Sequence, residues 1–341
     1  MIKKGSHLDG VEPINEKNIE KDIVLEILYK KIGEYNEAYE YLENIIEEKL
    51  IYDKSGYSGN SVLILKSQNG KEDLVIKISK NNELYHEYIS YNFFYKLNYT
   101  TKPLAYFECG EYEVMITEKI NLPTAGYYFN SYKEIAEFFG KKLRIFHEQN
   151  LINKINNKEE ENIFSHKYEN NYKKAISNNI VLKYLATYLN NNDVSEMKEY
   201  IVKNKEIINK NLVLVHGDFN PNNVFIDKNQ NIKLIDFCDT GYCNKHYDIF
   251  WTLFMIIIFS GILKEPEKIK ECEEIFYKSY GLYSINFEEI EYFKYFSSLY
   301  WKEHDEITRI DILWFLTLIF IIINILYHLF LVKFGLKKIT M

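Results

Sequence analysis

Two carboxylates and one amide in the stretch 212–237 have the types and spacing that phosphoryl transfer requires. Asn223 stands five positions after Asp218, and Asp236 follows on the next apolar run. Such a reaction needs one carboxylate to accept or orient the proton of an attacking hydroxyl. It also needs an amide oxygen and a second carboxylate that hold Mg²⁺ against a triphosphate. The rest of the chain must bring these three side chains together.

Three short apolar runs frame these residues and predict the strands that would position them. The runs 212–215 and 223–226 flank a polar loop, and 232–235 follows a turn rich in Asn. Short apolar runs bounded by turn residues are typical of strands. An Asn five positions after an Asp is also the spacing of a kinase catalytic loop. The alternative is a surface hairpin with polar tips, which the joint pattern disfavours.

The sequence His-Gly-Asp-x-x-x-x-Asn at 216–223, followed by Ile-Asp-Phe at 235–237, resembles the aminoglycoside phosphotransferase and choline kinase family. The resemblance implies an α+β, bilobal protein-kinase-like fold with a small antiparallel-sheet N-lobe and a mainly helical C-lobe. It implies that Asp218 and His216 form the catalytic group, with His216 anchoring the loop. Asn223 and Asp236 would hold Mg²⁺, and the phosphate donor would be ATP or GTP.

This resemblance divides the chain into three parts. Residues 1–48 are expected to form a helical extension, 49–120 a nucleotide-binding N-lobe, and 121–341 a catalytic and acceptor-binding C-lobe. The alternation in 74–79 predicts a third strand that carries Lys77. Lys77 resembles the lysine that grips nucleotide phosphates, which needs a carboxylate partner on the next helix. On the predicted helix 83–97 we favour Glu87 as that partner, with Glu83 as the alternative.

Two further segments of the N-lobe are expected to contact the nucleotide. Strands are predicted at 50–52 and 61–66, and the loop between them contains Ser58 and Gly59. Glycine lets a backbone approach phosphates closely, so this loop is expected to cover them. Strands are also predicted at 103–109 and 112–117. The segment of Thr117, Glu118 and Lys119 after them would be the hinge, where backbone groups pair with adenine.

The C-lobe is predicted to contain long apolar helices. An apolar stripe predicts a helix at 132–150, on which His147 is expected to be a hydrogen-bonded packing residue. The run 249–263 is too short to span a bilayer and predicts a buried helix. Asp248 is expected to cap this helix and to hydrogen-bond the catalytic loop.

A second apolar run, 312–332, is long enough to cross a membrane. Its polar residues Thr317, Asn324 and His328 share one helical face. We therefore favour a buried helix, with a membrane helix as the alternative.

Composition limits the partners. The 341 residues are 47% hydrophobic and carry a formal net charge of −7, which argues against a nucleic-acid binder, since such proteins normally show a basic stripe. The charge favours a cationic acceptor, and Asp305 and Glu306 are candidate residues near its site. The four cysteines form no Cys-x-x-Cys pair, which is typical of reduced thiols in the cytoplasm, where we expect the protein.

These observations predict a Mg²⁺-dependent kinase of a small molecule, with an aminoglycoside or a similar amino-sugar antibiotic as the favoured acceptor. One alternative is a kinase of choline or a sugar alcohol, or of an envelope glycan or lipid head group if 312–332 enters a membrane. Another is a catalytically inactive, kinase-like binding protein. The sequence leaves open the hydroxyl attacked and the choice between ATP and GTP, because acceptor pockets are built from variable helices and loops.

Overall fold

The computed structural model describes residues 51–53, 61–65, 73–79, 83–109, 112–177 and 193–300. Several predictions concern residues outside these ranges. They are the helical extension 1–48, the phosphate-covering residues Ser58 and Gly59, the acidic pair Asp305 and Glu306, and the apolar run 312–332.

The N-terminal half of the described chain is built on one antiparallel sheet with the strand order β1-β2-β3-β5-β4. The strands are β1 (Ile51–Asp53), β2 (Ser61–Leu65), β3 (Leu74–Ser79), β4 (Pro103–Cys109) and β5 (Tyr112–Glu118). Each lies within two residues of its predicted position, because short apolar runs separated by turn residues mark the strands. In the central strand β3, Lys77 pairs with Val62 of β2 and Met115 of β5.

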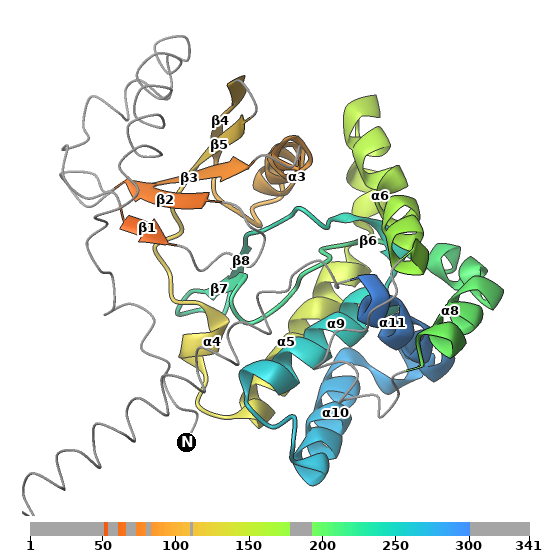
Figure 1. Cartoon of the computed structure of the whole chain (residues 1–341). Helices are drawn as coiled ribbons and strands as arrows, with labels where there is room; N and C mark the ends of the chain where they lie inside the picture. The colour runs from red at the N-terminus through yellow and green to blue at the C-terminus, as the bar shows by residue number, and fades with distance from the viewer. Residues whose placement is uncertain are drawn as a thin grey trace, which may run out of the picture.

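Helix α3 (Leu84–Lys96) packs beside this sheet (Figure 1) and begins on a carboxylate from β5. Its N-cap residue, Glu83, makes no side-chain capping bond. Instead, buried Glu113 accepts hydrogen bonds from the N–H groups of Leu84 (3.0 Å) and Tyr85 (3.3 Å). The first N–H groups of a helix have no partner within it, so a carboxylate there is stabilising. Glu113 thereby fixes the end of α3 from which Glu87 projects.

The second part of the chain is mainly helical (Figure 1). Its helices are α4 (Ala125–Tyr128), α5 (Tyr132–Glu148), α6 (Lys158–Ser177), α8 (Val194–Lys203), α9 (His246–Phe259), α10 (Pro266–Tyr280) and α11 (Phe287–Tyr300). Short 3₁₀ turns are η1 (Leu151–Lys154), η2 (Lys205–Asn209) and η3 (Leu282–Ser284). The predicted helix 132–150 corresponds to α5, and the predicted helix 249–263 corresponds to α9. None of the described helices is long and apolar enough to cross a membrane.

Two small sheets lie between the large sheet and the helices. β7 (Val224–Ile226) and β8 (Ile232–Leu234) form the predicted hairpin. β6 (Leu212–Val215) pairs instead with β9 (Gly241–Asn244), a strand that the sequence did not predict. The three apolar runs around the catalytic stretch therefore belong to two sheets. Within the hairpin, the Leu234 N–H donates to the Tyr99 carbonyl at 2.7 Å, which ties β8 to the loop after α3.

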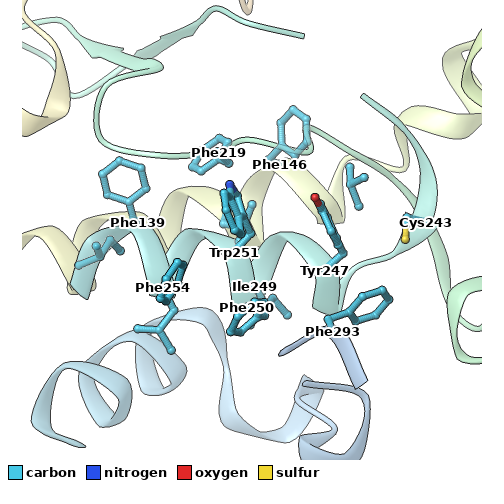
Figure 2. Close-up of a cluster of buried hydrophobic side chains, with 14 of the residues drawn as sticks. Phe139, Phe146, Phe219, Cys243, Tyr247, Ile249, Phe250, Trp251, Phe254 and Phe293 are labelled. Atoms are coloured by element: carbon cyan, nitrogen blue, oxygen red, sulfur yellow. The ribbon is translucent and has the colours of Figure 1, made fainter. Parts of the chain in front are cut away.

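Helix α9 forms the centre of the C-lobe core, together with α5, α10 and α11. Eleven of its residues are buried, so its apolar side chains point in all directions and no amphipathic stripe is left. Aromatic rings fill the space around it. Tyr247 packs on Tyr168. Tyr247 also packs on Phe293, and Phe254 packs on Trp251 (Figure 2). A helix of this kind is held rigidly on every side.

Replacing Glu113 with alanine should destabilise the fold. The N–H groups of Leu84 and Tyr85 would lose their acceptor. The Tyr106 hydroxyl would keep its longer contact with Glu108 at 3.2 Å but would lose the one with Glu113. We expect a loss of about 1–3 kcal/mol in the free energy of unfolding, measured by urea denaturation. The matched control is Glu108→Ala, an exposed glutamate of the same strand pair, which should change stability by less than about 0.5 kcal/mol. Equal stabilities for both variants would contradict the capping role.

Candidate active site

The loop between β6 and β7 carries Asp218 and turns sharply at Gly217. Gly217 has φ +90°, and a Cβ there would lie 2.3 Å from the carbonyl oxygen of Asp239. Only glycine adopts this conformation easily, and only glycine fits the close approach. Glycine at position 217, directly before Asp218, is therefore required by the path of the backbone.

Asp248, on the first turn of α9, binds the backbone of this loop through its carboxylate. Its two carboxylate oxygens accept hydrogen bonds from the N–H groups of His216 (2.8 Å) and Gly217 (2.9 Å). His147 Nε2 lies 3.2 Å from the same carboxylate, and its Nδ1 lies 2.8 Å from the Tyr280 hydroxyl. The expected contact with the catalytic loop is present. The expected helix cap is wrong, because α9 begins at His246 and its N-cap, Lys245, makes no side-chain capping bond.

The Asp218 carboxylate is surrounded by donors. Oδ1 accepts from Asn220 Nδ2 and from Trp251 Nε1, each at 2.7 Å, and Oδ2 accepts from Asn223 Nδ2 at 2.7 Å. Burial, with a smaller effect of the nearby Asp236 charge, raises the pKa of Asp218 to about 7. A carboxyl group with this pKa is a better proton acceptor at neutral pH than an ordinary aspartate.

His216 is fully buried beneath the loop. Its Nδ1 accepts the N–H of Asp218 at 3.2 Å, and its ring packs on Phe219 and Phe237. Burial lowers the pKa of His216, which favours the neutral ring that such an acceptor nitrogen requires. This geometry supports the expected role of an anchor for the loop and gives His216 no direct access to a substrate.

Asn223 and Asp236 are brought together by the backbone. The N–H of Ile235, next to Asp236, donates to the Asn223 carbonyl at 3.1 Å. Asp236 has φ +65°, an uncommon conformation for a non-glycine residue, and such strain is concentrated at functional sites. The Asn223 amide nitrogen bonds to Asp218, so its amide oxygen takes no part in that contact.

Lys77 joins the two lobes at this point. Its Nζ lies 2.7 Å from Glu87 Oε2 and 2.9 Å from Asp236 Oδ1. Burial opposes the charge of Lys77, but the carboxylates of Asp236 and Glu87 outweigh it and raise the pKa of Lys77 well above its ordinary value. Lys77 in turn lowers the pKa of Asp236 against the effect of burial. Of the two carboxylates considered as partners, Glu87 makes the contact.

The predicted hinge has its backbone groups already in use. The N–H of Glu118 donates to the Lys102 carbonyl (3.1 Å) and that of Lys119 to the Asp73 carbonyl (2.8 Å). The Glu118 carbonyl accepts from the Thr101 hydroxyl at 2.7 Å, and Thr117 is buried in the sheet. These groups are bonded at the end of the inner strand β5, so the adenine contact at Thr117, Glu118 and Lys119 stays a prediction.

Two side chains at Asp218 were missed by the sequence reasoning. Trp251 lies inside an apolar run that predicts only a buried helix, yet a buried indole N–H needs an acceptor, and that need was the available signal. Asn220 sits in a loop of several Asn residues. Its side-chain oxygen accepts the N–H groups of Asn222 and Asn223, which shapes the loop, while its nitrogen reaches Asp218.

Comparison with known proteins agrees with this geometry. The model of the "phosphotransferase enzyme family" matches residues 181–265. A probable aminoglycoside 3'-phosphotransferase of Lactococcus lactis subsp. lactis (strain IL1403) is 27% identical over 217 residues, which are 62% of this chain and 78% of the relative. The chain is therefore similar to this phosphotransferase family in the region that contains the Asp218 loop and to a relative over most of that relative's length. The similarity supports a phosphotransferase with a hydroxyl group as acceptor.

Solved structures support the protein-kinase-like fold. An aminoglycoside phosphotransferase of Streptomyces rimosus, in complex with ADP and streptomycin, has a TM-score of 0.54 at 14% identity and covers 72% of this chain and 94% of its own. A choline kinase of Streptococcus pneumoniae has a TM-score of 0.52 at 14% identity and covers 85% and 92%. The expected bilobal fold, with a small antiparallel sheet and a helical second lobe, is confirmed.

Changing Asp248 to asparagine should slow phosphoryl transfer. An amide offers one acceptor oxygen where the loop presents two N–H groups, so one of them would face an NH₂ group. We expect kcat to fall about tenfold to a hundredfold, since a shifted loop misplaces the catalytic carboxylate. Steady-state phosphotransfer assays measure this. Wild-type kcat in a folded Asp248→Asn variant would contradict the role of the carboxylate as the loop's support.

Proposed function

We propose that this kinase transfers the γ-phosphate of a magnesium-bound nucleoside triphosphate to a hydroxyl of a cationic amino-sugar of the aminoglycoside class. The observation that carries the proposal is the convergence of Asp218, Asn223 and Asp236 at one place, with Lys77 bonded to both Asp236 and Glu87. This set contains a proton acceptor, oxygen ligands for a divalent cation and a cation for phosphates.

Asp218 acts on the acceptor. Its carboxylate receives or orients the proton of the attacking hydroxyl, and its raised pKa suits this role. The ammonium group of Lys77 binds the nucleotide phosphates. The ion pair with Glu87 keeps that ammonium group in position. Lys77 also contacts Asp236. The residue that binds the phosphates is therefore in direct contact with one of the residues that hold the metal.

Asn223 and Asp236 are suited to hold magnesium. Mg²⁺ prefers oxygen ligands, and the lowered pKa of Asp236 keeps its carboxylate ionised. The Asn223 amide nitrogen is used by Asp218, which leaves the amide oxygen as the ligand. When bound, magnesium supplies charge neutralisation of the phosphates.

The choice of acceptor rests on relatives and charge. The Lactococcus relative is named a probable aminoglycoside phosphotransferase, and the Streptomyces rimosus enzyme binds streptomycin together with ADP. The net charge of −7 favours a cationic acceptor. ATP is the expected phosphate donor, in keeping with the ADP of that complex.

Asp218→Asn should abolish turnover while leaving nucleotide binding intact. Removing the proton acceptor costs about 10²–10⁴-fold in kcat, whereas Asp218 makes no contact with Lys77. Turnover is measured with ATP and with GTP over a panel of aminoglycosides, with choline as a further acceptor. Nucleotide binding is measured by calorimetry.

The matched control is Asp227→Asn on the exposed turn between β7 and β8, which should keep wild-type kcat within about twofold. Equal turnover in wild type and Asp218→Asn would contradict the mechanism. Turnover with choline alone would replace the proposed acceptor. Nucleotide binding without transfer to any acceptor would favour an inactive binding protein.

Chelation of divalent cations should stop turnover, and Mg²⁺ should restore it. We expect Asn223→Ala to raise the Mg²⁺ concentration for half-maximal rate at least tenfold, because a ligand oxygen is lost. Asn222→Ala, one residue earlier in the same loop and exposed, is the matched control and should not change that concentration. An identical Mg²⁺ dependence in the two variants would contradict the assignment of Asn223.

A further inference from the structure

Trp251 connects the core helix α9 to the catalytic carboxylate. It lies one turn after Asp248, and its side chain points from α9 toward the loop that carries Phe219, with the indole nitrogen uppermost (Figure 2). Only 5% of the residue is exposed, and Nε1 donates to Asp218 Oδ1 at 2.7 Å. An indole N–H only donates and never accepts, so this contact has one possible direction.

The donors around Asp218 leave one acceptor position open. A carboxylate has about four lone-pair positions, two on each oxygen. On Oδ1, Trp251 and Asn220 occupy both. On Oδ2, among the residues that the structure describes, only the Asn223 side chain donates. One position on Oδ2 therefore remains for a substrate hydroxyl.

We propose that Trp251 is a positioning residue, which locks Oδ1 of Asp218 and thereby turns Oδ2 toward the acceptor hydroxyl. This inference rests on the proposed function, in which Asp218 receives or orients the acceptor proton. Asn220 and Asn223 lie in the same loop as Asp218 and move with it. Trp251 is the donor that comes from a different element, so it fixes the carboxylate relative to the body of the C-lobe.

The surroundings of Trp251 make it a rigid support. Its ring packs 5.7 Å from that of Phe254, and Asp248 on the preceding turn holds the loop backbone. Residues three apart on a helix share a face. One face of helix α9 thus binds both the backbone of the loop, through Asp248, and the side chain of Asp218, through Trp251. These bonds oppose rotation of the Asp218 side chain relative to the loop.

The test removes a single hydrogen-bond donor without changing the shape of the side chain. In the full-length chain, Trp251 is replaced site-specifically by benzothienylalanine, in which sulfur stands for the indole N–H. We expect kcat to fall about tenfold to a hundredfold, as for a lost hydrogen bond to a charged group. The KM values for ATP and acceptor and the unfolding midpoint should stay within error, since packing is preserved.

Two controls separate positioning from packing. Replacement of Trp251 by 5-fluorotryptophan keeps the N–H and should retain wild-type kcat within about twofold. The simpler variant Trp251→Phe should lose kcat to a similar extent as benzothienylalanine, with some loss of stability. A benzothienylalanine enzyme with wild-type kcat, or with altered stability and KM values in proportion to kcat, would overturn the positioning role.

The experiment distinguishes this inference from the proposed function. Turnover by wild type and its loss in Asp218→Asn support the proposed function before Trp251 is tested. Unchanged kcat in the benzothienylalanine enzyme then overturns the role of Trp251 alone. A wild-type chain that phosphorylates no acceptor overturns both.

Discussion

The buried carboxylate of Asp248 is the interaction on which the active site depends. A loop that must expose Asp218 turns its backbone N–H groups inward, where water cannot reach them. Asp248 accepts two of these groups, and His147 and Tyr280 hold Asp248 in turn. This network extends from α10 through α5 to α9, so the packing of three helices determines the path of the loop that carries Asp218.

Lys77 provides the second constraint, because it belongs to the sheet while Asp236 belongs to the hairpin after the catalytic loop. A charged group inside a protein is tolerated only when it is paired. Here the buried ammonium group of Lys77 is shared by the carboxylates of Glu87 and Asp236. The hairpin is also bonded to the loop after α3, through Leu234 with Tyr99 and Lys233 with Asn98. The lobes are therefore joined beside the residues proposed to hold the metal.

The sequence predicted those parts of the site in which local pattern and chemistry coincide. Alternating residues located β3 and Lys77, and the spacing of Asp218 and Asn223 located the loop. β9 was missed because Gly-Tyr-Cys-Asn at 241–244 shows no strand period, and its pairing with β6 is a tertiary contact. The roles of Asp248 and Trp251 were incomplete for a related reason. An apolar helix that is buried all round does not show which of its faces meets the loop.

The hydrogen-bond donors to Asp218 come from near and distant positions in the chain, so the orientation of this carboxylate depends on tertiary packing. Asn220 and Asn223 can bond to Asp218 as soon as the loop forms, since they are two and five residues away in the chain. Trp251 is 33 residues away and reaches Asp218 only after α9 has docked beneath the loop. The carboxylate therefore acquires its final orientation with the packing of the C-lobe core. Substitutions around α9 that disturb Phe254 or Phe250 would act on catalysis through Trp251, although neither ring is among the donors to Asp218.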